Sequence, residues 1–99
     1  MTRSIAAAAL ALAAAAAHAQ ETPAARSLAA TCASCHGTDG HSATKEVASL
    51  AGLQKDYIVA QMKAFRDGTR PATIMNQLAK GYSDAQIELV ADYFSRRPR

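Results

Sequence analysis

Residues 32–36 place two thiols and an imidazole in the order C-x-x-C-H, as Cys32, Cys35 and His36. Two thiols three residues apart on one helical turn can form thioether bonds with the two vinyl groups of a single porphyrin, and the imidazole that follows then lies under the iron. In an exported chain this spacing is typical of covalent haem attachment. It predicts one covalently bound haem c, attached at Cys32 and Cys35, with His36 as the proximal iron ligand.

Three other interpretations of the cysteine pair stay open at this point. A thioredoxin-like dithiol also uses C-x-x-C, but it expects a βαβ pattern and gives the histidine no role. A structural zinc site needs four ligands, and His41 is too close in sequence to complete a tetrahedron with Cys32, Cys35 and His36. A disulfide across so short a loop would stabilise little.

The second axial ligand decides between electron transfer and ligand chemistry at an iron held by His36. Met62 lies on the apolar stripe of a predicted helix, where a thioether usually fills space in the core. His41 follows His36 by only five residues, too short a path to the opposite face of the porphyrin. Met75 lies in an irregular segment long enough to cross that face. We predict His36/Met75 ligation, which raises the reduction potential and favours one-electron transfer over catalysis, because both axial positions are filled.

The first residues have the features of a secretory signal peptide. Arg3 gives a positive start, residues 5–17 form an alanine-rich apolar run, and Ala17-His18-Ala19 fits the small-x-small cleavage rule. The run is shorter than the roughly 17 to 25 apolar residues that span a bilayer. We predict a cleaved leader at residues 1–19, a single domain at residues 20–99, a periplasmic location and no stable membrane insertion.

Charge and size restrict the function classes. The chain has 11 Lys and Arg against 8 Asp and Glu, a net charge of +3. No basic stripe is interleaved with aromatic side chains, as binding to single-stranded nucleic acid would require, so we expect no nucleic-acid partner. A domain of this size is marginally stable on its protein core alone. A bound haem would supply the missing apolar contacts.

Hydrophobic periodicity predicts three helices. The first has Thr22 as N-cap and Pro23 at the first helical position, and it runs to about Ser34. The second covers residues 55–66, where apolar side chains recur at helical spacing. The last begins with a capping box and carries an apolar stripe, formed together by Ser83, Gln86, Ile87, Val90, Ala91 and Phe94.

Two long loops connect these helices. Residues 37–53 show neither a helical nor an alternating period, and a loop of this length is expected to have a function, here to wrap the cofactor. Leu50 and Leu53 are predicted haem contacts in this loop, although plain core packing would explain two leucines equally well. Residues 69–81 form the second loop and carry Met75. The expected fold class is all-α, with three main helices and long loops around one covalent haem.

Several motifs fall in the order found in small single-haem class I cytochromes c. They are residues 32–40 (CASCHGTDG), residues 50–53 (LAGL), Tyr57, Gln61, residues 65–70 (FRDGTR), Met75 and the Tyr93-Phe94 pair. From about Ala24 to Arg97 the chain resembles this family. The resemblance implies the cytochrome c fold, thioether bonds at Cys32 and Cys35, and His36/Met75 ligation.

Residues 65–75 (FRDGTRPATIM) and 79–82 (AKGY) are similar to the cytochrome subunit of flavocytochrome c sulfide dehydrogenase. In such complexes an FAD subunit oxidises sulfide and passes electrons one at a time to the haem. This resemblance implies a non-catalytic electron-transfer subunit whose redox partner is a flavoprotein. Some members of that family carry two haem domains, whereas this sequence has one C-x-x-C-H.

Two other functions stay open. One is a free-standing electron shuttle of the c553 or c4-like type that serves an oxidase. The other is a five-coordinate haem sensor or peroxidase, in which Met75 is not bound. A permanent subunit should expose an apolar patch around the haem edge, whereas a shuttle should use a charged, salt-sensitive surface. The cations that could form such a surface are Lys45, Lys55, Lys63, Arg66, Arg70 and Lys80.

Overall fold

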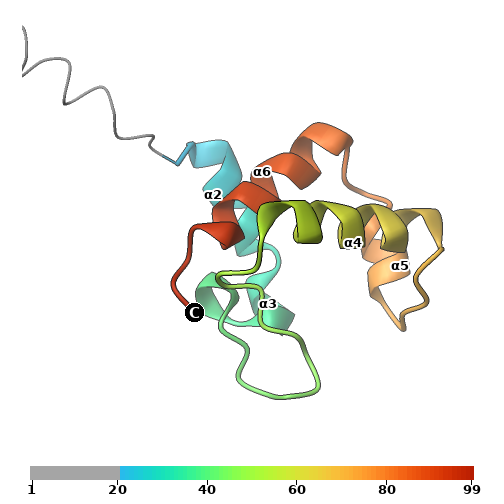
Figure 1. Ribbon diagram of the computed structural model, residues 1–99, viewed down its shortest axis with the longest axis horizontal. Helices are drawn as coiled ribbons and strands as arrows, with labels where there is room; N and C mark the ends of the chain where they lie inside the picture. Colours follow the sequence, from blue (N-terminus) through green and yellow to red (C-terminus); the bar gives the residue numbers. More distant parts are fainter. Residues whose placement is uncertain (1–20) are drawn as a thin grey trace, which may run out of the picture.

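The computed structural model describes residues 21–99, and the predicted leader at residues 1–19 lies outside the described residues. The described part is helical and contains no strand, which confirms the all-α fold class. Its helices in chain order are α2 (Pro23–Ala30), α3 (Ala33–His36), the 3-10 turn η1 (Thr38–Gly40), α4 (Lys55–Asp67), α5 (Met75–Ala79) and α6 (Asp84–Ser95). Figure 1 shows α2, α4 and α6 gathered together, with the loop after η1 extending away from them.

The first helix begins as predicted but ends earlier. Oγ1 of Thr22 accepts a hydrogen bond from the backbone N–H three residues on, and a proline follows it. Oγ1 of Thr31 donates to the carbonyl oxygen of Leu28 at 2.7 Å, a local bond that competes with regular helix geometry. The prediction of one continuous helix to about Ser34 is therefore wrong, because a turn at residues 31–32 separates α2 from α3.

The last helix has the predicted N-terminus and the predicted buried face. Oγ of Ser83 accepts a hydrogen bond from N–H of Gln86 at 3.2 Å, and N–H of Ser83 donates to Oε1 of Gln86 at 2.9 Å. This capping box satisfies backbone donors that the first turn leaves unpaired. The buried side chains of α6 are Ile87, Val90, Ala91, Tyr93 and Phe94.

The segment predicted as the second loop, residues 69–81, contains a short helix. Gly68 ends α4 in the left-handed conformation with φ of 80°. The chain then reverses, and α5 packs against α4. Met75 is the first residue of α5 and does not lie in an irregular stretch, so this part of the prediction is wrong. A helix of five residues is too short to display a hydrophobic period in the sequence.

The core lies where α2, α4 and α6 meet (Figure 1). Its buried members are Ala29, Ile58, Val90, Ala91, Tyr93 and Phe94. The carbonyl oxygen of Phe94 accepts a hydrogen bond from N–H of Gly52 at 3.0 Å, which fastens the loop before α4 to the end of α6. The core therefore fixes both α4 and this loop, and these two segments form walls of the cavity described next.

Candidate haem-binding site

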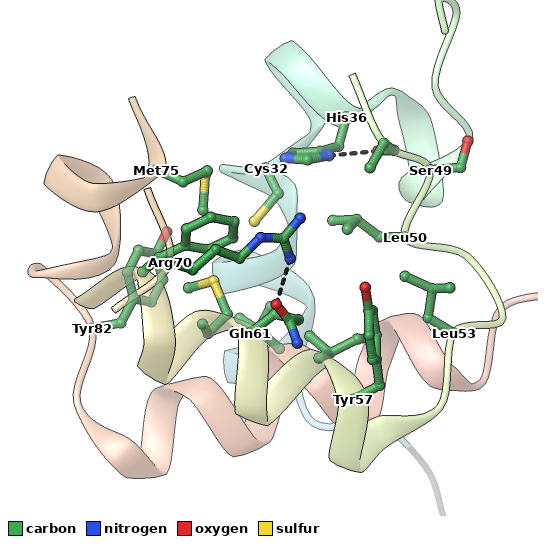
Figure 2. A pocket seen from close by; sticks show the side chains of 15 residues that line it. Cys32, His36, Ser49, Leu50, Leu53, Tyr57, Gln61, Arg70, Met75 and Tyr82 are labelled. Carbon is green, nitrogen blue, oxygen red and sulfur yellow. Dashed lines mark hydrogen bonds between the residues drawn. The ribbon is translucent and has the colours of Figure 1, made fainter. Parts of the chain in front are cut away.

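An apolar cavity of about 330 Å³ lies between α4, the loop before it and the junction of α2 and α3. Figure 2 shows the side chains that enclose it. They are Cys32, His36, Ala48, Ser49, Leu50, Leu53, Tyr57, Ile58, Gln61, Met62, Phe65, Arg70, Met75, Tyr82 and Val90. A second cavity of about 420 Å³ shares several of these residues and extends toward Cys35.

His36 stands at the end of α3 with its ring directed into the cavity (Figure 2). Its Nδ1 lies 2.6 Å from the carbonyl oxygen of Ala48. A carbonyl can only accept, so Nδ1 carries a proton, and in the neutral ring Nε2 then keeps its lone pair. A histidine held in this tautomer by a backbone carbonyl is prepared to bind a metal through the other nitrogen. No feature of the sequence pointed to Ala48, because it contributes only a backbone oxygen.

The two cysteines are not joined to each other by a disulfide. Cys32 lines both cavities, whereas Cys35 is exposed and lines only the second one. Burial raises the pKa of the Cys32 thiol, an effect partly opposed by its hydrogen bond with Thr31. The pair is therefore placed along one border of the apolar space, with His36 one residue beyond Cys35.

Met75 approaches the cavity from the side opposite the loop that carries Leu50 and Leu53 (Figure 2). Its position depends on α5, which packs on α4. Met62 also lines the cavity, and it packs against the core as well. The structure thus brings together His36 and Met75, the two residues predicted as axial ligands, around one space.

Leu50 and Leu53 both lie on the cavity wall. Their loop is held by the carbonyl oxygen of Gly40, which accepts hydrogen bonds from N–H of Leu50 at 2.8 Å and from N–H of Ala51 at 3.2 Å. Gly40 has φ of 80°, and a Cβ there would lie 2.8 Å from the Phe94 ring and from N of Ala51. Only glycine allows this approach, so it sets how closely the loop follows the cavity.

Three residues that the sequence analysis did not assign to the site, Tyr57, Gln61 and Phe65, line the cavity from α4. They recur every four residues, and this spacing could have identified them as one face of a helix. Gln61 accepts a hydrogen bond from Nη1 of Arg70 at 2.5 Å, and the Arg70 guanidinium lies 4.7 Å from the centroid of the Phe65 ring. Tyr82, from the segment after α5, completes the wall.

His41 lies away from the cavity. Its Nε2 is 2.7 Å from the carbonyl oxygen of Pro98, near the C-terminus, and its Nδ1 is 3.3 Å from the carbonyl oxygen of Thr38. Within residues 21–99, no three or more His, Cys, Asp or Glu side chains are arranged to hold a metal ion by themselves.

The lining fits a haem. The walls are mostly aliphatic and aromatic, as a flat apolar macrocycle requires, and Arg70 with Gln61 offers polar groups to its carboxylates. An imidazole nitrogen and a thioether sulfur form a donor pair suited to haem iron, and two thiols lie at the border for covalent attachment. This arrangement in a small helical domain defines the class of c-type haem proteins.

Comparison with known proteins gives the same class. Residues 21–96 match the family model for cytochrome c, and the chain belongs to the cytochrome c family. Membership of this family gives the chain a covalent haem c as its cofactor, with the C-x-x-C-H spacing of Cys32, Cys35 and His36.

Two relatives and one solved structure are informative. The chain is 42% identical over 67 residues to the cytochrome subunit of sulfide dehydrogenase of Chlorobaculum tepidum, covering 68% of this chain and 60% of that one. It is 40% identical over 68 residues to cytochrome c-554(548) of Halomonas halodenitrificans, covering 66% of this chain and 82% of that one. The structure of cytochrome c4 of Acidithiobacillus ferrooxidans matches with a TM-score of 0.66 and 34% identity, covering 77% of this chain and 51% of that one.

The chain thus spans about half of the cytochrome c4 structure and 60% of the sulfide dehydrogenase subunit. Within residues 21–99, no helix combines the length and the apolar character needed to cross a bilayer.

Proposed function

We propose that this protein is a periplasmic monohaem electron carrier, with a leader at residues 1–19 and a cytochrome c domain at residues 20–99. Cys32 and Cys35 would carry the haem through thioether bonds, and His36 and Met75 would hold its iron. Leu50 and Leu53 contact the macrocycle. The assignment is supported by the cavity that all of these residues except Cys35 line, and by the Nδ1 bond of His36 that frees Nε2.

The haem supplies a one-electron couple at its iron, and the chain tunes and protects it. His36, oriented by Ala48, supplies a basic nitrogen ligand. The thioether of Met75 favours the ferrous state and raises the reduction potential relative to a second histidine. Apolar walls keep water from the metal, which limits rearrangement when the charge changes. If His36 and Met75 both held the iron, no open position would be left for a small oxidant to bind.

The surface around the second cavity indicates how the protein meets its partner. Ile74 and Leu78 are 55% and 47% exposed, and with Val47 they line this cavity, next to Cys35. We call Val47, Ile74 and Leu78 the docking patch. Its position at the attachment border would place it at the haem edge. Glu46 is the one Asp, Glu, Lys or Arg among the residues that line this cavity.

The cations that could have formed a charged docking surface are partly engaged elsewhere. Lys55 pairs with Glu88 at 3.2 Å, and Arg66 pairs with Asp84 at 2.7 Å. The Arg66 guanidinium holds the pKa of Asp84 below its usual range. An apolar patch at the haem edge suits a lasting interface more than a salt-sensitive encounter. This observation favours a haem subunit that accepts electrons from an FAD-containing sulfide dehydrogenase partner.

The test compares docking-patch and charge variants of the full chain, purified by an affinity tag from its native cells. We expect the wild-type protein to retain a flavin-containing partner in high salt, with haem reduction that depends on sulfide. The Ile74→Ser, Leu78→Ser double variant should lose both properties, while Lys63→Gln, Lys80→Gln should keep them. A partner that salt releases, and that only the lysine variant weakens, would instead indicate a diffusing shuttle.

A further inference from the structure

Asn76, beside the predicted axial methionine, uses its side chain to close the segment between α4 and α5. Its Oδ1 accepts a hydrogen bond from N–H of Ala72 at 2.8 Å. Its Nδ2 donates to the carbonyl oxygen of Phe65 at 2.9 Å and to that of Arg70 at 2.8 Å. Both amide hydrogens and one oxygen lone pair are therefore engaged by backbone groups.

These three partners lie at the end of α4 and in the connection to α5. N–H of Arg70 also donates to the carbonyl oxygen of Ala64 at 3.1 Å, so the start of the connection is held to α4 without Asn76, whereas Asn76 extends this link to Ala72 and to α5. Phe65 is in the last turn of α4, and its carbonyl oxygen also accepts a hydrogen bond from N–H of Gly68 at 3.3 Å, so Asn76 adds a second donor to it. Arg70 and Ala72 lie in the connection that leads to α5. One side chain thus fixes the end of α4, the connection and the first turn of α5 relative to one another. An aspartate would keep the bond from Ala72 but could donate to neither carbonyl.

The short helix needs such support. α5 has five residues, and its N-cap, Ile74, provides no side-chain hydrogen bond. An isolated helix of this length is not stable in water, so its position depends on contacts with the rest of the chain. Met75 precedes Asn76 in the first turn, and its sulfur reaches the cavity only while this turn is in place.

We propose that Asn76 is a positioning residue for the axial ligand: its three hydrogen bonds hold Met75 at the cavity and set how strongly the thioether competes with other ligands for the iron. The inference rests on the proposed ligation by Met75. Asn76 would then do more than stabilise the fold, because loosening the first turn of α5 would weaken the bond between the Met75 sulfur and the iron.

The test uses the purified holoprotein as wild type, Asn76→Ala, Asn76→Asp, Met75→Ala and Gln77→Ala. Gln77 is exposed on the same short helix and serves as the matched control. The readouts are the affinity of the ferric protein for imidazole, the near-infrared band of methionine-ligated ferric haem, and the reduction potential. Because two donated hydrogen bonds are lost, we expect both Asn76 variants to bind imidazole about tenfold more tightly or more, with a weaker band and a lower potential. Gln77→Ala should match the wild type.

The outcomes separate the two proposals. If wild type and Met75→Ala bind imidazole equally, ligation by Met75 is wrong, and the proposed role of Asn76 is wrong as well. If they differ strongly but both Asn76 variants match Gln77→Ala, ligation stands and the positioning role is overturned. A lower melting temperature in the Asn76 variants with unchanged imidazole affinity and potential also overturns it, since that is the result of a purely structural role. If Asn76→Ala does not fold, Asn76→Asp decides by the same criteria.

Discussion

The hydroxyl of Tyr93 donates a 2.6 Å hydrogen bond to Oδ1 of Asp39, although the two residues are 54 positions apart. Tyr93 lies in α6 with 7% of its surface exposed, and Asp39 lies in the turn that follows His36. The bond therefore couples the C-terminal helix to the segment that carries the predicted proximal ligand. It also raises the pKa of Tyr93, with burial as a further cause, because ionising the hydroxyl would remove the donor.

This coupling predicts a stability that depends on pH at the alkaline end. A tyrosine whose folded pKa lies above its ordinary value of 10.0 contributes stability below pH 10, and this is lost as the pH rises through the folded pKa. At neutral pH, Tyr93→Phe should lower the free energy of unfolding by about 1 to 2 kcal/mol, since the bond ends on a charged acceptor. Urea unfolding at several pH values should show the difference shrinking above pH 10. A constant difference at every pH would contradict this.

Met75→Ala should open the axial position. The ferric protein should lose its near-infrared methionine band, the ferrous protein should bind carbon monoxide, and the reduction potential should fall, because a strong-field thioether is replaced by solvent. Met62→Leu is the matched control, since it removes the other sulfur that lines the cavity with little change in volume. If Met62→Leu abolished the band and Met75→Ala did not, the axial ligand would be Met62 and our assignment of Met75 would be wrong.

Two glycines with nearly equal φ should respond differently to alanine. Gly37 has φ of 83° and follows His36, and a Cβ there would collide with the carbonyl oxygen of His41. Gly68 has φ of 80°, but a Cβ there would meet nothing within 4 Å. Gly68→Ala should cost about 1 kcal/mol for the left-handed backbone. Gly37→Ala should cost roughly 3 kcal/mol or more and disturb the His36 ring, as measured by unfolding and by the haem absorption spectrum.

Substitution of a buried and of an exposed apolar residue should distinguish a role in folding from a role in docking. Phe94 is 1% exposed in the core, so Phe94→Ala should lower the free energy of unfolding by about 3 to 5 kcal/mol. Leu78 is 47% exposed in the docking patch, so Leu78→Ala should change the free energy of unfolding by less than about 0.5 kcal/mol. Denaturant unfolding of the holoprotein measures both. A large loss from Leu78→Ala would mean that this side chain serves the fold and not a partner.

Chemical motifs predicted from the sequence proved more informative than local helix propensity. Cys32 and His36 could be predicted as haem-binding residues because covalent haem attachment requires a fixed spacing. The capping box of α6 was predicted correctly because its two side chains are close in sequence. The end of α2 depends on the Thr31 hydroxyl, whose bond to Leu28 no hydrophobic pattern reveals.

The parts that the sequence did not predict depend on contacts between distant segments. Ala48 orients the His36 ring with a backbone oxygen, so its residue type carries no information about this role. Asn76 is an ordinary polar residue in the sequence, and only the folded chain brings Phe65, Arg70 and Ala72 within its reach. α5 lacks the length that makes helical periodicity visible.

The packing of α5 has a consequence for how the molecule opens. α5 packs chiefly on α4, whereas α2, α4 and α6 share the core. Segments with few partners open by sub-global fluctuations well before the whole chain unfolds. Amide hydrogens in residues 68–82 should therefore exchange with deuterium sooner than those of α6. The chain would then consist of two cooperative units, and the less protected one carries the distal face of the site.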